Sequence, residues 1–367
     1  MPGPRRIDRF RRVVARLASV GLAAIAAVLA GPAPAPAQAR LKPATWSARA
    51  PAGGGSRPMR DVLLRGDSAA LRPARVAAGS DIYRTRRNEP LRVILSPAFI
   101  PNRAAVQSFV DFMGSRLHGR ELSRLTVYLA PLSEIAARCA PGAVACYAPN
   151  LQLLVGPGEN TPTGEFTKEF AVTHEYGHHI ARNRNNSPWS ALLRGPKRWG
   201  TFHHVCQRVA AHQLFPGDEG AQYAANPGEA WAQSYAFYHY PTGQPWQFTP
   251  LLAPVPGTRP AIRGDVLSPW HADTTLTRRG SFAGAGARVT TRSFATRLDG
   301  RATFALSGPS GANLDLEVIV DGRVAASSRR AGSREFIAGD LCGLRRIAVR
   351  VTRVRGAGPF RLVARLP

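Results

Sequence analysis

The segment His174-Glu175-Tyr176-Gly177-His178 constrains the fold more than any other feature of this 367-residue chain. Two histidines four positions apart lie on one face of an α-helix, so both can bind the same metal ion. A glutamate next to the first histidine is placed to act as general base toward a metal-bound water molecule. The segment therefore predicts a helix that carries His174 and His178 as zinc ligands and Glu175 as the catalytic base.

The residues around this segment favour the same helix. Apolar or small residues recur at helical spacing between Glu165 and Arg182. Thr163 is a suitable N-cap with Glu165 in the first turn, and Asn183 begins a stretch that ends the helix. The recurring residues are Phe166, Phe170, Thr173, Gly177 and Ile180. The alternative is a core helix whose histidines are only hydrogen-bonded.

A catalytic zinc site uses three protein ligands and keeps one position open, so a third ligand has to come from elsewhere. The extended pattern HExxHxxGxxH is excluded, because Ala181 and Arg184 stand where it needs Gly and His. Pro227 and Gly228 open a second predicted helix with Glu229 in its first turn. Glu229 is therefore the predicted third ligand, unless its carboxylate only interacts with the helix dipole. Less suitable candidates, which look like surface or core polar residues, are Asp218, Glu219, His203, His204 and His212.

At this point residues 85 to 245 resemble the gluzincin group of zinc metallopeptidases. In that group an HExxH helix is joined by a Glu from a later helix, often within a stretch like N-P-x-E-x-F-A-E, and residues 226–235 read Asn-Pro-Gly-Glu-Ala-Trp-Ala-Gln-Ser-Tyr. The resemblance implies one Zn²⁺ held by His174, His178 and Glu229, with Glu175 driving hydrolysis of a protein or peptide substrate. Such families often carry an acidic residue that orients the first His, and Gln233 stands at that position.

An oxyanion stabiliser is also expected, and the aromatic cluster after Glu229 offers the candidates Tyr235, Tyr238, His239 and Tyr240. His179 points off the metal-binding face, which indicates a supporting or solvent-facing role. Two other functions remain open. One is an inactive protein of the same fold that binds the cell envelope, and the other is a zinc hydrolase of non-peptide amide bonds.

The first 39 residues have the layout of a secretory signal peptide. Six Arg lie between positions 5 and 16, an apolar or small stretch covers 17–30, and Ala37-Gln38-Ala39 offers a cleavage site. No later stretch is long and apolar enough to span a bilayer. We therefore expect a secreted or envelope-associated protein, with an uncleaved anchor as the alternative.

Four cysteines suit an exported chain, because disulfides persist in oxidising compartments. Cys139 and Cys146 are close enough in sequence to join a hairpin, which leaves Cys206 and Cys342 to pair with each other. Four cysteines allow three connectivities, and the sequence does not choose among them. No CxxC spacing suggests that they bind metal.

The net charge of +26 comes almost entirely from arginine, since Lys42, Lys168 and Lys197 are the only lysines. A solvated basic surface is the default, with weak attraction to anionic cell-envelope polymers as a further expectation. No nucleic-acid-binding motif is present, and export makes nucleic acid an improbable partner.

The mature chain divides into three predicted parts. Residues 40–80 are rich in Ala, Arg, Gly and Pro and form either a flexible linker or a pro-segment. Residues 81–280 form an α+β, zincin-like catalytic domain, with a Pro-rich loop or connection over 241–270. Its expected strands are 91–95, 125–129, 144–147 and 151–155, and its expected helix covers 103–117. One of the last two strands is a candidate edge strand for an extended substrate.

Residues 281–367 are predicted to form a small β-sandwich. Alternating runs at 314–320, 346–351 and 360–364 are separated by Gly-rich turns, including Asp321-Gly322. This tail resembles the pre-peptidase C-terminal type domain appended to many secreted bacterial peptidases, chiefly in its Gly-rich final strand. The resemblance implies a role in targeting, stability or substrate binding, and a structural cap without a partner is the alternative.

Overall fold

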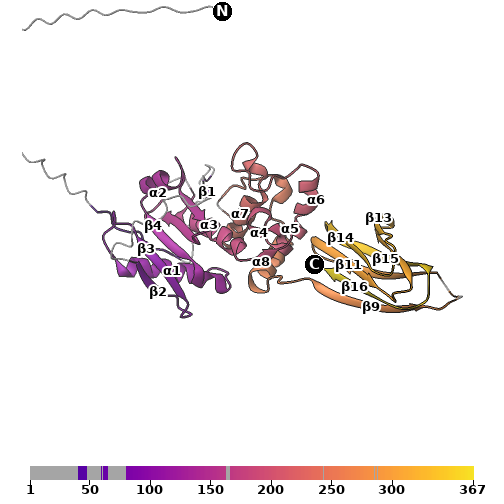
Figure 1. The fold of residues 1–367 in the computed structure, drawn as a ribbon. Coiled ribbons are helices and arrows are strands. Elements are labelled where there is room, and N and C mark those ends of the chain that lie inside the picture. The colour runs from indigo at the N-terminus through magenta and orange to yellow at the C-terminus, as the bar shows by residue number, and fades with distance from the viewer. Residues whose placement is uncertain are drawn as a thin grey trace, which may run out of the picture. The chain divides into compact units, whose positions relative to one another are not determined.

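The computed structural model describes residues 40–47, 59, 61–64, 80–162, 166–242, 244–284, 286 and 288–367. These residues form an α+β part that contains the HExxH segment and an all-β part at the C-terminus (Figure 1). Each part has its own large hydrophobic core. The predicted signal peptide, residues 1–39, lies outside the described residues.

A mixed sheet organises the α+β part. Its strand order is β1-β5-β6-β4-β3-β2. The parallel pairs are β1 with β5, β6 with β4 and β4 with β3, whereas β5 runs antiparallel to β6. The strands are β1 (Asp61–Leu63), β2 (Ser80–Arg84), β3 (Pro90–Leu95), β4 (Thr126–Ala130), β5 (Ala145–Ala148) and β6 (Leu153–Pro157). The four strands predicted from apolar runs correspond to β3, β4, β5 and β6.

Helices cover both faces of this sheet. Side chains alternate along a strand, so each strand contributes to two cores. One face packs in the main core with helices α1 (Arg103–Gly114) and α3 (Lys168–Arg182), and the other face packs against Ile135 of α2 (Leu132–Arg138). Helix α3, which carries the HExxH segment, packs against β5 and β6.

The chain after α3 is largely helical. Helix α7 (Pro227–His239) packs against α3 and belongs to the main core. The other elements in this region are β7 (Asn185–Asn186), β8 (Trp189–Ser190), α4 (Ala191–Arg194), α5 (Lys197–Phe202), α6 (Val205–Ala210), η3 (Tyr223–Ala225), η4 (Pro250–Leu252) and α8 (Thr258–Leu267), with η2 (Arg120–Arg124) preceding them. The prediction of a loop or connection over 241–270 is corrected by α8, whose Ile262 and Val266 are buried in the main core.

Residues 40–80 were predicted to be a flexible linker or a pro-segment, and their described parts are packed rather than flexible. Trp46, Met59 and Leu63 are buried in the main core of the α+β part. Asp61–Leu63 forms β1, and Leu41 forms a bridge with Phe99. The described parts of 40–80 therefore belong to the folded domain, and the Gly53–Gly55 run lies outside the described residues.

The C-terminal part is a sandwich of two four-stranded antiparallel sheets, as the alternating pattern predicts. Their orders are β10-β15-β12-β13 and β14-β11-β16-β9, and inward apolar residues of both fill the core between them. The strands are β9 (Thr274–Phe282), β10 (Val289–Thr296), β11 (Gly300–Ser307), β12 (Asn313–Val320), β13 (Arg323–Ser328), β14 (Glu335–Leu341), β15 (Arg345–Arg355) and β16 (Gly358–Leu366). Because β9 pairs with β16, the sandwich begins before the predicted boundary at 281.

Two disulfides join Cys139 to Cys146 and Cys206 to Cys342. This is one of the three connectivities that the sequence allows, and it pairs the two cysteines that are closest in sequence. The first ties the end of α2 to β5, and the second ties α6 to the sandwich. Both are consistent with a secreted protein. Within the described residues, no helix is both long and apolar enough to cross a membrane.

Candidate metal centre

Helix α3, which carries the HExxH residues, is buried along almost its whole length. It begins at Lys168, and the Thr167 side chain accepts a hydrogen bond from Phe170 N at 3.2 Å. Thr167 is therefore the N-cap, while the predicted cap Thr163 and the first-turn Glu165 lie outside the described residues. Residues 168–181 are all buried, so the HExxH side chains are held by packing on both sides of the helix.

Helix α7 brings Glu229 to α3. The Asn226 side chain accepts a hydrogen bond from Gly228 N, and Pro227 occupies the first turn, as its missing N–H favours. The two helices approach closely at Gly177, where an added Cβ would lie 2.8 Å from the Cα of Ala232. Trp231 Nε1 also donates to the Gly177 carbonyl at 2.8 Å, which fixes the register of α7 on α3.

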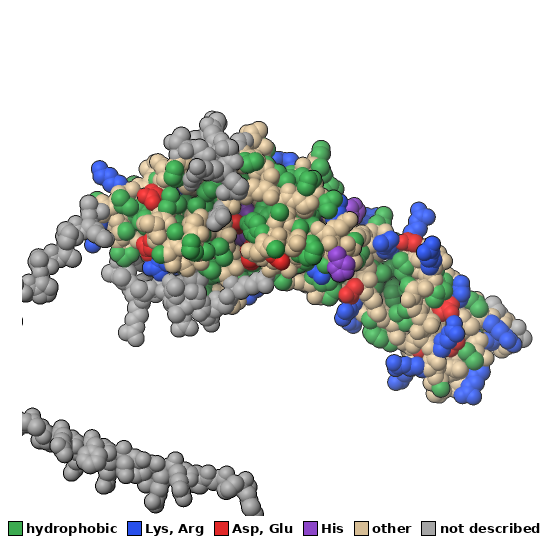
Figure 2. Space-filling model, turned by 90° about the horizontal axis from the view of Figure 1, so that it is seen from above, with side chains coloured by type: hydrophobic (Ala, Val, Ile, Leu, Met, Phe, Trp, Pro, Cys, Tyr) green, Lys and Arg blue, Asp and Glu red, His purple; other side chains and the backbone are tan. Residues whose placement is uncertain are grey.

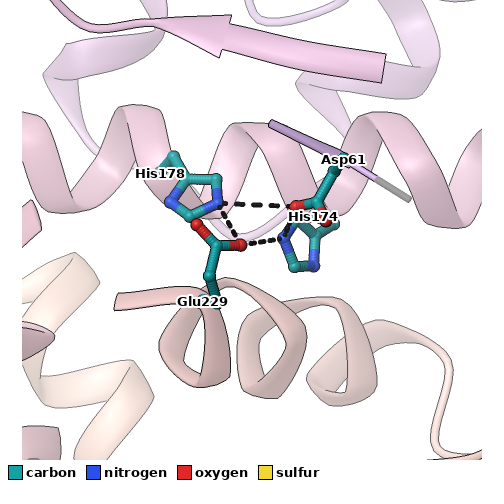
Figure 3. Close-up of side chains that lie close together, drawn as sticks. All are labelled: Asp61, His174, His178 and Glu229. Atoms are coloured by element: carbon teal, nitrogen blue, oxygen red, sulfur yellow. Dashed lines mark hydrogen bonds and ion pairs between the residues drawn. The ribbon is translucent and has the colours of Figure 1, made fainter. Parts of the chain in front are cut away.

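The three ligands predicted from the sequence meet at one point (Figure 3). Glu229 Oε2 lies 3.3 Å from His174 Nε2 and 3.2 Å from His178 Nε2. Ligands bound tetrahedrally at zinc–ligand distances of about 2.0–2.1 Å are separated by roughly 3.3 Å. The spacing of these atoms therefore matches a metal site.

A fourth residue, Asp61 of β1, completes the cluster and was missed by the sequence analysis. Asp61 Oδ2 lies 2.6 Å from His174 Nε2 and 3.9 Å from His178 Nε2. One ligand atom from each of Asp61, His174, His178 and Glu229 lies within 4.8 Å of the others, and all four residues are buried. No motif marks Asp61, because a lone acidic residue in an Arg- and Gly-rich stretch carries no periodic signal.

The residues fit a divalent cation. Glu229 Oε1 is buried without a hydrogen-bond partner among the described residues, and Asp61 Oδ2 is buried against His174 Nε2. Buried carboxylates are costly unless they are paired or bind a metal. The Nε2 atoms of both histidines face the carboxylates, as neutral imidazole ligands would face a bound ion. The cluster could therefore hold a metal ion, and its two histidines and two carboxylates suit zinc among other divalent ions.

The charges in the cluster shift one another's protonation. Burial acts to lower the pKa of His174, but Asp61 and then Glu229 raise it to about 9. Burial likewise opposes protonation of His178, whose pKa is raised well above its usual value chiefly by Glu229. The two histidines in turn hold the pKa of Asp61 well below its usual range in spite of burial. The carboxylates of Asp61 and Glu229 thus stabilise positive charge at the Nε2 atoms of the two histidines, whether protons or a cation carry it.

Glu175 follows the first histidine ligand directly, and its carboxylate has fewer hydrogen bonds than those of Asp61 and Glu229. Both of its carboxylate oxygens are buried without a hydrogen-bond partner in the described part of the chain. Burial, followed by the charge of Asp61, raises the pKa of Glu175 well above its usual value. A raised pKa and free oxygens are properties expected of a group that takes and passes on a proton.

The predicted oxyanion stabilisers contact other groups. Tyr235 donates to the Leu117 carbonyl at 2.5 Å, and His239 Nε2 accepts from Leu117 N at 3.2 Å. Tyr238 and Tyr240 accept hydrogen bonds from arginine side chains at 3.0 and 2.7 Å. The hydroxyl at the cluster belongs instead to Tyr223 of η3, which donates to Asp61 and lies 3.4 Å from Glu229 Oε2. Tyr223 precedes Glu229 in the chain, outside the aromatic cluster that follows it.

Two further predictions are corrected. Gln233 does not support His174, because its side chain bonds the Pro245 carbonyl and the Gln247 amide, and His174 Nδ1 has no partner among the described residues. Of the two roles expected for His179, only the solvent-facing one is wrong: His179 is buried, and its ring forms hydrogen bonds with Tyr147 and the Glu121 carbonyl. The rivals to Glu229 lie outside the cluster; for example, His203 Nε2 is 3.1 Å from Thr258 Oγ1.

No protein-family model matches this chain, and no curated protein matches its sequence. A pre-peptidase C-terminal domain of collagenase from Bacillus anthracis is 16% identical, with 25% of this chain and 89% of that one covered and a TM-score of 0.21. PliG, a periplasmic inhibitor of g-type lysozyme from Aeromonas hydrophila, is 14% identical over 26% and 85% of the two chains, with a TM-score of 0.19. The SPBc2 prophage-derived protein YomS is 14% identical over 25% and 95%, with a TM-score of 0.17. Scores this low support no argument about fold or function.

Proposed function

We propose that this chain is an exported zinc-dependent hydrolase of peptide bonds, of the gluzincin type, with a zincin-like catalytic domain. The observation that carries the proposal is the convergence of His174, His178 and Glu229 next to Glu175. Glu229 Oε2 lies at a separation suited to zinc from the Nε2 atom of each histidine, and no described residue forms a hydrogen bond with either oxygen of the adjacent Glu175 carboxylate. The gluzincin resemblance of residues 85–245 points the same way.

The roles of the chain's own residues follow from this geometry. His174 and His178 would hold the zinc ion through Nε2, and Glu229 would hold it through Oε2. When bound, zinc supplies a Lewis acid that polarises the scissile carbonyl and lowers the pKa of a coordinated water molecule. Glu175 takes the proton of the attacking water and passes it to the leaving amine nitrogen. Tyr223 is the side chain placed to donate a hydrogen bond to the developing oxyanion.

Metal content is the first test, because it requires no knowledge of the substrate. We expect about one zinc per chain by elemental mass spectrometry of protein purified without chelator. Glu175→Gln should keep the zinc and lose hydrolysis of an unstructured protein by roughly 10²- to 10⁴-fold, the usual contribution of a general base. Protein that neither contains nor takes up zinc would rule out the proposal and favour an inactive envelope-binding protein. Zinc with hydrolysis only of small amides would favour the non-peptide hydrolase.

The C-terminal sandwich is proposed to bind anionic polymers of the cell envelope. Residues 274–367 contain 17 Arg, no Lys and 6 Asp or Glu, a net charge of +11. Figure 2 shows Arg side chains, in blue, spread over this part of the molecule, the right-hand part in that view. A dense basic surface attracts polyanions by charge alone and would hold the enzyme near envelope-bound substrates.

A further inference from the structure

Strand β1 places the Asp61 carboxylate at the position that a catalytic zinc site keeps open for water or substrate. A catalytic zinc keeps one coordination position for water or substrate, whereas a site with four protein ligands is closed. Asp61 reaches the fourth place: its side chain is 1% exposed, and its Oδ2 lies 2.6 Å from His174 Nε2, a hydrogen-bond distance that a bound ion would widen. Its other oxygen accepts the hydrogen bond of the Tyr223 hydroxyl, so Asp61 also engages the proposed oxyanion donor.

The same strand occupies the edge of the sheet nearest the site. Asp61, Val62 and Leu63 pair with Ala145, Cys146 and Tyr147 of β5. Without β1, β5 would be the exposed edge, and an exposed edge is where extended peptides add as a further strand. One three-residue strand therefore covers both the metal position and the backbone groups to which a peptide substrate would bind.

The contacts of β1 anchor it firmly at both faces. Leu63 is buried in the main core, and Val62 and Leu64 pack against the core on the opposite face of the sheet. Leu64 N donates to the Tyr147 carbonyl at 3.0 Å, which continues the pairing beyond the strand. Alternation along the strand turns Asp61 to the face of α3, where the two histidines lie.

We propose that Asp61–Leu63 is an internal blocking strand that keeps the site latent until it is displaced. This inference rests on the proposed function, because it concerns the regulation of that same site. Asp61 acts as a removable fourth ligand, and the backbone of β1 stands in for the substrate strand on β5. The competing arrangement is a permanent four-ligand site in which Asp61 serves only to hold a structural metal.

The test compares the full chain with its Asp61→Ala variant, and Asp81→Asn serves as the control, since Asp81 is an exposed acid on β2 at the far edge of the sheet. Three quantities are measured: zinc per chain, binding of a fluorescent hydroxamate that chelates open zinc sites, and hydrolysis of an unstructured protein. We expect Asp61→Ala to keep about one zinc and to gain hydroxamate binding by roughly tenfold or more. Hydrolysis should rise by a similar factor only when Leu64→Pro is added, because that change removes the Leu64 N–H that holds β1 on Tyr147 of β5. The control should match the unmodified chain in all three.

The outcomes separate this inference from the proposed function. Loss of zinc in Asp61→Ala, or equal hydroxamate binding by the two proteins, would overturn the blocking role and indicate a structural fourth ligand. Gained hydroxamate binding in Asp61→Ala, without any hydrolysis by the Asp61→Ala/Leu64→Pro variant, would support Asp61 as the blocking ligand and reject the hydrolase. Asp61→Ala/Leu64→Pro combined with Glu175→Gln should bind hydroxamate and zinc but not hydrolyse, which excludes a contaminating protease.

A peptide tests the strand separately from its carboxylate. A capped peptide with the sequence of residues 59–64 should inhibit the Asp61→Ala variant that also carries Leu64→Pro, in which β1 is loosened from β5, and should compete with the hydroxamate. The same peptide with Ala at the aspartate position should bind at least about tenfold more weakly, because it keeps only the strand pairing. Failure of the first peptide to compete at any soluble concentration would contradict the proposed docking of β1 at the substrate edge.

Discussion

At the scale of single residues, the site is a set of buried charges that stabilise one another. Removing one partner from such a set leaves the others unpaired, so each side chain has a larger effect than its own contact suggests. His174, His178 and Glu229 could be predicted because helical spacing and helix-start residues mark them. Asp61 and Tyr223 could not, because the three-residue β1 and the short η3 that carry them show no periodicity.

Glu229→Ala is expected to weaken zinc binding by roughly a hundredfold or more, because it removes a direct ligand and leaves both histidines without their shared carboxylate. The measurement is competition for zinc against a chromophoric chelator. Asp273→Ala, which removes an exposed acid, is the control and should not change the affinity. Unchanged affinity in Glu229→Ala would identify a different third ligand.

Tyr223→Phe tests the hydroxyl at the cluster. In the Asp61→Ala/Leu64→Pro background we expect kcat to fall by about 10²-fold, with KM and zinc content nearly unchanged, because the hydroxyl acts on charge that develops only in the transition state. Tyr238→Phe is the matched control, since that hydroxyl bonds Arg263 and not the cluster. A larger loss from Tyr238→Phe would restore the candidate expected from the sequence.

At the scale of elements, the distance between α3 and α7 sets the position of Glu229. The sequence predicts both helices from their periodic apolar residues, but it does not show that Gly177 is the point where they touch. Helix α8 was missed because its stretch is rich in proline. Pro260 lies in the first turn of α8, where a missing N–H costs little, so this proline does not prevent the helix.

Gly177→Ala should therefore separate the two helices. The added methyl group would lie 2.8 Å from the Ala232 backbone, and overpacking of this kind costs about 1–3 kcal/mol. We expect a lower melting temperature and weaker zinc binding, since Glu229 moves with α7. Gly339→Ala, where an added Cβ meets nothing within 4 Å, should change neither. Loss of stability with unchanged zinc affinity would show that α7 adjusts without moving Glu229.

The packing of α5 against α8 predicts a pH dependence. Burial, and next the charge of Arg208, lowers the pKa of His203 from 6.5 to about 4. The unfolded chain then binds this proton at higher pH than the folded chain, so the free energy of unfolding falls as pH drops from about 6.5 to about 4. The loss is at most about 3 kcal/mol. In urea titrations at several pH values, His203→Asn should show a shallower decline, whereas His212→Asn, at an exposed histidine, should keep the original slope.

At the scale of the whole molecule, the sandwich is joined to the helical region by specific contacts. The disulfide between Cys206 and Cys342 links them covalently, and the buried Lys197 Nζ donates to the Asp299 carbonyl at 2.8 Å. Alternating apolar residues allowed the sandwich to be predicted from sequence. The distribution of its charge could not be predicted, because only the pairing of strands shows which arginines share a face.

The two outer faces of the sandwich differ in charge balance. On β15 and the turn after β13, Arg350 and Arg329 both pair with Glu317. On the other sheet, Arg279 and Arg361 stand directly opposite each other on β9 and β16, and Arg365 follows on the same face. All three are exposed, and no ion pair joins them to an acid among the described residues. Like charges placed side by side are unfavourable, so this face gains most from a polyanion.

The variant in which Gln replaces Arg279, Arg361 and Arg365 should elute from a polyanion resin such as heparin at a lower salt concentration than the unmodified chain. Each lost contact between an arginine and a sulfate or phosphate group weakens the binding and reduces its salt dependence. The control replaces Arg329, Arg345 and Arg350, each of which is ion-paired, and removes the same total charge. If binding depended on net charge alone, both triple variants would elute at the same salt. Earlier elution of the first variant alone would place the polyanion on the β9–β16 face, whereas equal elution would reject that surface.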